Sequence, residues 1–200
     1  MNIAGVVLAG GRSSRMGRDK ALLRPFGDSN PPMLATTWRL VTQCASPCWV
    51  SCAPGQPYAG YPCLFDDEKG QGPLSGVTVA LRSARAASCD AVLTLPCDLP
   101  FMDVDTLRAL LSAHDQSATD NLVTMYSASS GRAETLVAVY ATAALPFLES
   151  ALSSGRRCLF QSIPADKRQL LYYDETCAQR FFNINDARDL ALVVTLLSQQ

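Results

Sequence analysis

The chain has 200 residues, 48% of them hydrophobic, which suffices for one buried core and excludes a disordered chain. Its 17 basic and 18 acidic residues give a net charge of −1, which excludes a global basic field for holding nucleic acid. The N-terminal apolar run, IAGVVLA (3–9), is too short for a signal-peptide core or a membrane span. We therefore expect one cytoplasmic domain over residues 1–200, without membrane or nucleic-acid partners.

Apolar, β-rich runs alternate with helix-like stretches along the chain. The expected strands are residues 3–9, 47–53, 91–97, 121–127 and 135–141. The expected helices are residues 33–45, 74–87, 103–114, 142–154 and 186–199, with Asp103 and Asp186 as N-caps of the third and fifth. The strand runs lack period-two polarity, so the pattern predicts an α/β fold with a mostly parallel sheet covered by helices. Ligands of such folds lie at the carboxyl ends of the strands.

The chain has eight cysteines and one histidine. No two cysteines have the spacing of a zinc knuckle or a redox motif, so we expect small, buried, apolar residues. A metal held by Cys44, Cys48 and Cys52 is not favoured, because Pro47 interrupts the helix that this spacing requires. We expect the histidine, His114, to be a surface residue in the polar tail of a helix.

The stretch LAGGRSSRMGRDK (8–20) follows the first expected strand. Gly10 and Gly11 allow the tight turn that brings backbone N–H groups close to a phosphate oxygen. Behind them come four charged donors suited to phosphate, namely Arg12, Arg15, Arg18 and Lys20. The spacing matches neither the P-loop nor the dinucleotide fingerprint. A solvated basic turn is the alternative, but glycines directly before the arginines favour a polyphosphate site.

A lone acid, Asp98, stands between Pro96 and Pro100 at the end of an expected strand. The two prolines stiffen the backbone and hold the carboxylate in a fixed place. A carboxylate beside a polyphosphate commonly holds Mg²⁺, so we expect Asp98 to be a metal ligand. The alternative is an acid at a turn or helix start, but Asp103 is better placed to cap the next helix.

The irregular stretch FDDEKGQGPLSG (65–76) gathers acids ahead of glycines. Asp66 and Asp67 precede Gly72 and Gly76, and such a loop can approach a base or ribose before a helix starts. A polar surface loop is the alternative interpretation.

The late stretch RFFNINDARDL (180–190) follows an aromatic strand and carries Asn183 and Asn185. Asparagine amides both donate and accept hydrogen bonds, which suits substrate contacts. Asn185 is also a common turn residue, whereas Asn183 lies next to the aromatic pair and favours a functional role.

Taken in order, the motifs L-A-G-G, R-M-G-x-D-K, D…G-P-L-x-G, P-C-D-x-P and a late N-x-N resemble the molybdenum cofactor guanylyltransferases. The resemblance covers nearly the whole chain. It implies a single three-layer, Rossmann-like nucleotidyltransferase domain that uses Mg²⁺ and GTP to attach GMP to molybdenum-molybdopterin, with release of pyrophosphate. The product is the molybdopterin guanine dinucleotide cofactor, which family members supply to molybdoenzymes or their chaperones.

The resemblance also implies roles for individual residues. The nucleotide-binding backbone falls on Leu8, Ala9 and Gly10, and the guanosine-side aspartate falls on Asp66. The catalytic set comprises the phosphate-binding Lys20 with Arg15, and Asp98 as the metal ligand. The positions that shape the active site or the pterin side fall on Arg15, Gly72, Gly76, Asn183 and Asn185. Ser51 departs from the family pattern, because relatives carry Asn there.

Three interpretations stay open on the sequence alone. The first is the guanylyltransferase. The second keeps the fold and Asp98 but changes the base or acceptor, as in a cytidylyltransferase for the same cofactor or an enzyme for another small phosphate. Relatives that transfer CMP read L-A-A-G, so Gly10 leaves more room for a purine. The third is a nucleotide-binding carrier or accessory protein that releases no pyrophosphate.

Overall fold

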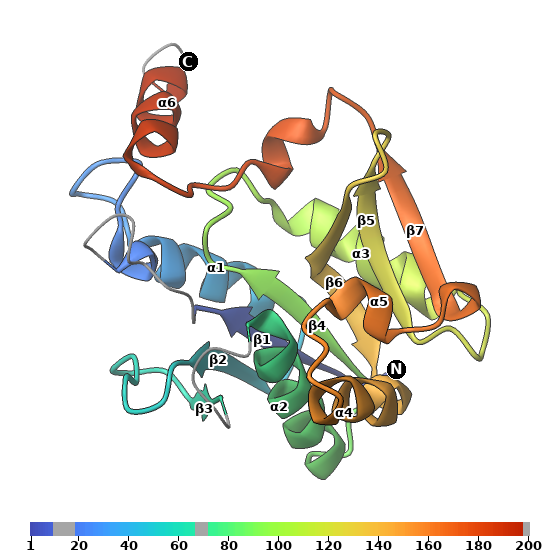
Figure 1. The fold of residues 1–200 in the computed structure, drawn as a ribbon. Helices are drawn as coiled ribbons and strands as arrows, with labels where there is room; N and C mark the ends of the chain where they lie inside the picture. Colours follow the sequence, from blue (N-terminus) through green and yellow to red (C-terminus); the bar gives the residue numbers. More distant parts are fainter. Residues whose placement is uncertain (10–18, 67–71, 198–200) are drawn as a thin grey trace.

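A seven-stranded sheet in the order β3-β2-β1-β4-β6-β5-β7 forms the centre of the molecule (Figure 1). The structure is a computed structural model and describes residues 1–9, 19–66 and 72–197. The strands are β1 (Ile3–Leu8), β2 (Cys48–Cys52), β3 (Cys63–Phe65), β4 (Ala91–Pro96), β5 (Val123–Ala128), β6 (Ala133–Ala141) and β7 (Arg168–Tyr173). All five strands expected from the apolar runs are present.

The two central strands, β1 and β4, are buried almost along their whole length, as their uninterrupted apolar sequences predict. They pair in parallel, with Ile3 opposite Ala91 and Leu8 opposite Pro96. Strands β2 and β3 continue the parallel pairing on one side, and β5 pairs in parallel with β7 on the other. Strand β6 runs antiparallel to both β4 and β5, because the short connection between β5 and β6 allows only a hairpin. The prediction of a mostly parallel α/β sheet is confirmed.

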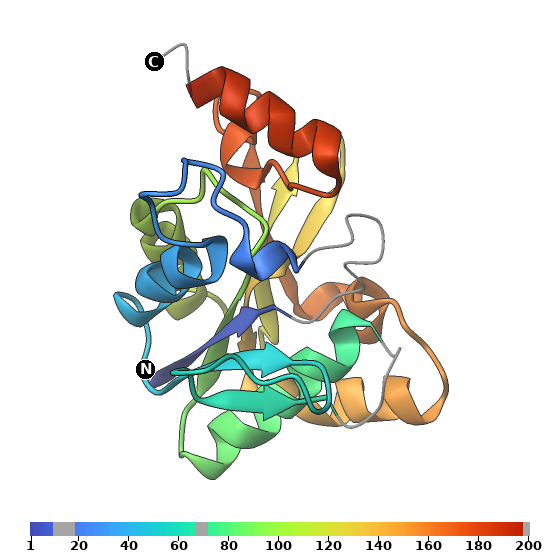
Figure 2. The same ribbon diagram turned by 90° about the vertical axis from the view of Figure 1, so that its left-hand side faces the viewer.

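Helices cover both faces of this sheet, as Figures 1 and 2 show. Helices α1 (Met33–Thr42) and α3 (Val104–Asp115) pack on one face. Helices α2 (Pro73–Ala86), α4 (Leu145–Ser153) and the short α5 (Leu159–Ser162) pack on the other. Helix α6 (Ala187–Leu197) lies above the carboxyl edge of the central strands. The layers are therefore helix, sheet and helix.

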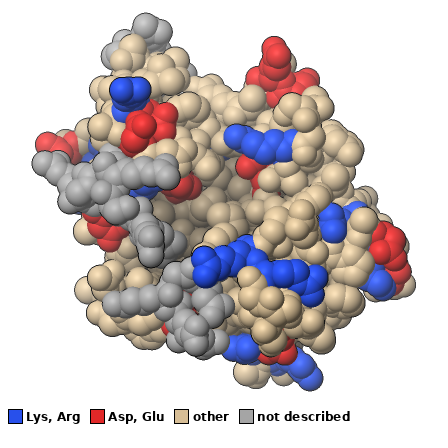
Figure 3. Space-filling view, in the orientation of Figure 1, with Lys and Arg blue, Asp and Glu red and all other residues tan. Residues whose placement is uncertain are grey.

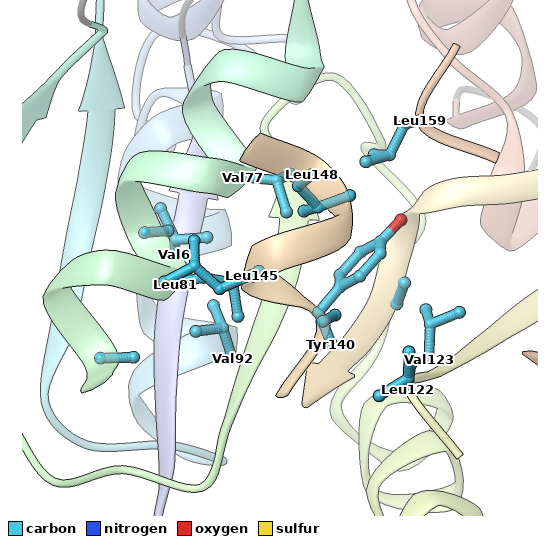
Figure 4. Close-up of a cluster of buried hydrophobic side chains, with 14 of the residues drawn as sticks. Val6, Val77, Leu81, Val92, Leu122, Val123, Tyr140, Leu145, Leu148 and Leu159 are labelled. Carbon is cyan, nitrogen blue, oxygen red and sulfur yellow. The ribbon is translucent and has the colours of Figure 1, made fainter. Parts of the chain in front are cut away.

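Figure 4 shows how the face under α2 and α4 is filled. Side chains of both helices meet those of β1, β4 and β6 in one apolar cluster that leaves Tyr140 fully buried. Its labelled members on these elements are Val6, Val77, Leu81, Val92, Tyr140, Leu145 and Leu148. This packing fixes the sheet on which the candidate site is built.

Both expected N-caps are confirmed. The Asp103 carboxylate accepts a hydrogen bond from the backbone N–H of Thr106 at 2.7 Å, which starts α3. Asp186 Oδ1 accepts from the backbone N–H groups of Arg188 at 2.7 Å and Asp189 at 3.1 Å, which starts α6.

The expectation that His114 lies on the surface is wrong. Its side chain is 4% exposed, and Nδ1 lies 2.9 Å from the Thr124 hydroxyl. The last turn of α3 packs against β5, so the polar tail of this helix faces inward here. Thr124 also receives a hydrogen bond from Asn121 and donates one to Gln169, which satisfies this buried polar group.

The cysteines only partly follow the expectation of burial. Cys52, Cys89 and Cys97 are buried, whereas Cys158 is exposed, and the remaining four are half-buried. The strand over Cys48–Cys52 is confirmed. In the part of the chain that the structure describes, no helix is both long and apolar enough to cross a bilayer.

Candidate functional site

Strands β2, β1 and β4 end side by side at one edge of the sheet. The backbone N–H of Cys97, just past β4, donates to the carbonyl oxygen of Leu8 at 3.2 Å. The N–H of Ala9, just past β1, donates to the carbonyl oxygen of Ser51 on β2, also at 3.2 Å. These bonds bring the predicted nucleotide-binding residues Leu8 and Ala9 next to the turn that carries Asp98.

Asp98 follows β4 directly and belongs to that turn. Its Oδ1 atom is buried and has no hydrogen-bond partner among the described residues. Burial raises the pKa of the Asp98 carboxyl, and the nearby charge of Lys20 opposes this rise. The site therefore holds a carboxylate oxygen that is shielded from water and open to a cationic partner.

Lys20 is the first residue of a short 3-10 helix, η2 (Lys20–Leu22). The preceding Asp19 caps this helix, because Asp19 Oδ1 accepts from the backbone N–H of Ala21 at 3.0 Å. Ala21 is fully buried and fixes η2 on the core. The positive charge of Lys20 lowers the pKa of both Asp98 and Asp186, so its ammonium group acts at the carboxyl edge beside Asp98.

Asp66 and Gly76 meet on the other side of Leu8. The Ser51 hydroxyl donates to Asp66 Oδ1 at 3.4 Å. A Cβ atom at Gly76 would lie 2.7 Å from Ser51 Oγ, 3.3 Å from Asp66 Oδ1 and 3.7 Å from Leu8 Cδ2. Glycine at position 76 therefore allows α2 to approach the ends of β1 and β2. Sequence reasoning gave Ser51 no contact, and its fully polar neighbourhood becomes visible only in three dimensions.

Gly72 directly precedes α2 and has a φ of +70°. A residue with a side chain is strained in this conformation, which explains glycine at this position. Pro73 then occupies the first turn of α2, where its missing N–H costs nothing. The pair turns the chain sharply into α2 near Asp66 and Gly76.

Asn183 and Asn185 are brought to the same edge from the other end of the chain. They follow a 3-10 helix, η5 (Ala178–Phe181), and flank Ile184. The N–H of Ile184 donates to the carbonyl oxygen of Asp98 at 2.9 Å. Asn185 Nδ2 donates to the carbonyl oxygen of Asn183 at 3.4 Å, and the N–H of Asn185 donates to Asp189 at 2.7 Å. Asn185 thus has the turn role that its sequence context suggests.

The molecule is hollowed on the face that Figure 3 shows. Lys and Arg atoms border the lower rim of the hollow, over the segment that joins α4 to α5. That segment contains the exposed Arg156 and Arg157, and Arg156 Nε donates to Ser154 Oγ at 3.0 Å. Exposed arginines at a rim offer charge to an anionic ligand.

Several predicted site residues lie outside the described residues. They are Gly10, Gly11, Arg12, Arg15, Arg18 and Asp67. The choice between Asp66 and Asp67 as the nucleotide contact therefore stays a prediction, as do the ligands assigned to all the site residues.

The three-layer fold, with a lysine and a buried carboxylate at the carboxyl edge of its central strands, defines an α/β protein of the nucleotidyltransferase type. Two solved structures share this fold. One is molybdopterin-guanine dinucleotide biosynthesis protein A from Archaeoglobus fulgidus, with a TM-score of 0.77, 21% identity, and coverage of 98% of this chain and 100% of that one. The other is 2-C-methyl-D-erythritol 4-phosphate cytidylyltransferase from Thermus thermophilus, with a TM-score of 0.67, 20% identity, and coverage of 99% and 100%.

The chain belongs to the family described as the MobA-like NTP transferase domain, whose model matches residues 5–169. A probable molybdenum cofactor guanylyltransferase of Rhodopirellula baltica is 34% identical over 94% of this chain and 90% of the relative. Another, from Mycobacterium avium, is 31% identical over 95% of this chain and 94% of the relative. The predicted family and fold class are confirmed.

Proposed function

We propose that this protein transfers GMP from GTP to the terminal phosphate of molybdenum-molybdopterin, releasing pyrophosphate and forming the molybdopterin guanine dinucleotide cofactor. Family membership and relatives named as molybdenum cofactor guanylyltransferases support this reaction. The structural observation that carries the proposal is the buried Asp98 Oδ1 next to the charge of Lys20, where β1 and β4 end.

Mg²⁺ suits the Asp98 site. The buried Oδ1 has no hydrogen-bond partner within the described ranges, and burial raises the pKa of the carboxyl, so a cation would offset the cost of its charge. Carboxylate oxygens are the protein ligands that Mg²⁺ prefers, and it usually takes only one or two with the rest from phosphate and water. When bound, Mg²⁺ neutralises phosphate charge and aligns the reacting groups.

Lys20 is the residue that we assign to the β- and γ-phosphates. An oxygen of the acceptor phosphate forms a bond to the α-phosphorus, while the bond from the α-phosphorus to the bridging oxygen of the β-phosphate breaks. The leaving pyrophosphate gains negative charge, which a positioned ammonium group stabilises. Arg15, outside the described residues, is expected to share this role. The acceptor phosphate is already ionised at neutral pH, so no side-chain base is required.

The remaining site residues fall on two sides of Asp98. We assign Leu8, Ala9, Gly10 and Gly11 to the nucleotide-binding backbone. Asp66, Gly72 and Gly76 form the nucleoside side, because Asp66 and Gly76 meet beside Leu8. Asn183 and Asn185 are assigned to the pterin side, because Ile184 ties their segment to Asp98. The exposed Arg156 and Arg157 add positive charge at the rim.

We further propose that the reaction takes place in the cytoplasm and that the finished cofactor passes to molybdoenzymes or their chaperones. The near-neutral net charge of −1 agrees with small-molecule substrates, for which an anion site is built locally.

The test is pyrophosphate release from GTP, CTP, ATP or UTP, each with molybdenum-molybdopterin and with or without Mg²⁺. We expect release that requires GTP, Mg²⁺ and the acceptor together. Faster release from CTP would transfer the same mechanism to the cytosine dinucleotide cofactor. GTP binding without any release would favour a carrier or accessory protein.

A further inference from the structure

Tyr58 connects two segments that lie far apart in the sequence. It belongs to the loop that joins β2 to β3, and its hydroxyl donates to Asp19 Oδ2 at 2.8 Å. The side chain is half-buried and packs against the core on the α1 and α3 face. The loop therefore contacts the chain exactly one residue before Lys20.

Both oxygens of Asp19 are engaged in this arrangement. Oδ2 accepts from Tyr58, and Oδ1 accepts from the backbone N–H of Ala21. The carbonyl oxygen of Asp19 accepts from the N–H of Leu22 at 3.2 Å, which completes the turn of η2. Asp19 thus fixes the backbone from which the Lys20 side chain starts, and Tyr58 fixes Asp19.

The loop is itself held firmly enough to act as an anchor. The backbone N–H of Tyr58 donates to Cys63 Sγ at 3.4 Å, at the start of β3. Tyr61 packs edge-on against Trp38 of α1, with ring centroids 5.2 Å apart. Burial and the contact with Asp19 raise the pKa of Tyr58, so its hydroxyl keeps its proton and donates at neutral pH.

We propose that Tyr58 is a positioning residue for the phosphate-binding Lys20, acting through Asp19. Without the hydroxyl, Asp19 Oδ2 loses its donor, and the carboxylate is left to compete with phosphate for the neighbouring ammonium group. The effect falls on the outer phosphates of the nucleotide, because those are the groups assigned to Lys20. The inference rests on the proposed function and deepens it.

The experiment compares Tyr58→Phe with Tyr61→Phe. Each variant loses one hydroxyl from the same loop and keeps its ring, and the Tyr61 hydroxyl makes no hydrogen bond to a described residue. Calorimetry measures the Kd of GTP, GDP and GMP in the presence of Mg²⁺. We expect Tyr58→Phe to weaken GTP binding about tenfold and to leave GMP binding unchanged, because a hydrogen bond to a charged group is lost. Tyr61→Phe is expected to match the wild type with all three nucleotides.

A double-mutant cycle identifies Asp19 as the intermediary. In an Asp19→Ala background, Tyr58→Phe is expected to have no further effect on GTP binding. Equal losses for GTP and GMP, or equal GTP binding by the two tyrosine variants, would overturn the inference alone. A wild-type protein that binds no GTP would overturn the proposed function and the inference with it.

Discussion

The backbone N–H of Ile184 donates a 2.9 Å hydrogen bond to the carbonyl oxygen of Asp98. This bond joins the chain just before α6 to the turn after β4. The connecting segment, residues 174–185, is called the strap here. It starts where β7 ends and brings Asn183 and Asn185 to the edge that carries Asp98.

Phe181 holds the strap on the sheet. Its ring stacks on Tyr173 with centroids 4.0 Å apart and lies 5.0 Å from the ring of Tyr126. Phe181 is 2% exposed, so Phe181→Ala is expected to lower the free energy of unfolding by about 3–5 kcal/mol, measured by urea denaturation. The matched control is Tyr172→Ala. Tyr172 is 69% exposed, and its loss is expected to change stability by less than about 0.5 kcal/mol. Equal effects of the two variants would show that the aromatic stack does not hold the strap.

Gly76→Ala tests the close approach of α2 to Ser51 and Asp66. Alanine normally stabilises a helix over glycine by about 0.5–1 kcal/mol. Here its Cβ would lie 2.7 Å from Ser51 Oγ, so we expect a net loss of about 1–3 kcal/mol and a raised KM for GTP. Adding Ser51→Ala removes the nearest atom, and the double variant is expected to recover most of the stability. A double variant as unstable as Gly76→Ala alone would contradict the contact. Thermal unfolding and initial rates give both readouts.

His114 makes stability depend on pH, because burial lowers its pKa below the ordinary value. The unfolded chain binds a proton at this residue at about pH 6.5, whereas the folded protein resists it. The stabilising effect is therefore complete above about pH 7 and is lost as the pH falls below about 6.5, by up to about 1.4 kcal/mol per pH unit. Urea midpoints between about pH 5 and 8 measure this loss.

His114→Gln removes the only histidine of the chain and is expected to flatten the curve in this range. Asp98 acts with the opposite sign, because its raised folded-state pKa favours the protonated folded form as the pH falls. Comparing His114→Gln with its parent in an Asp98→Asn background separates the two groups. A slope that His114→Gln leaves unchanged would assign the pH dependence to other residues.

The sequence predicts the fold well where local pattern and tertiary structure agree. The apolar runs of β1 and β4 are buried on both faces, and Asp103 and Asp186 cap helices as expected. Strand β3 has three residues inside a loop rich in glycine and proline, too few to show a period. The direction of β6 is set by its hairpin connection, which apolar composition does not reveal.

The site is predictable residue by residue but not contact by contact. Motifs indicate Lys20, Asp66 and Asp98, because each stands at a break between strand and helix. The supporting contacts join distant segments, as Tyr58 does with Asp19, and nothing local in the sequence marks such a pair. His114 is the same case, because the inward turn of the end of α3 depends on its packing against β5.

The central claim is that the buried Asp98 carboxylate is required for GMP transfer, and Asp98→Asn tests it most directly. The measurement is the rate of pyrophosphate release from GTP with Mg²⁺ and molybdenum-molybdopterin, next to thermal unfolding. Asp105→Asn is the matched control, since it removes an exposed carboxylate from α3. We expect Asp98→Asn to lower kcat at least about 100-fold, the usual loss for a charge-stabilising group. Its Tm is expected to equal or exceed that of the wild type, because burial disfavours the ionised carboxyl. Wild-type rates in a folded Asp98→Asn variant would remove Asp98 from the mechanism and contradict the account.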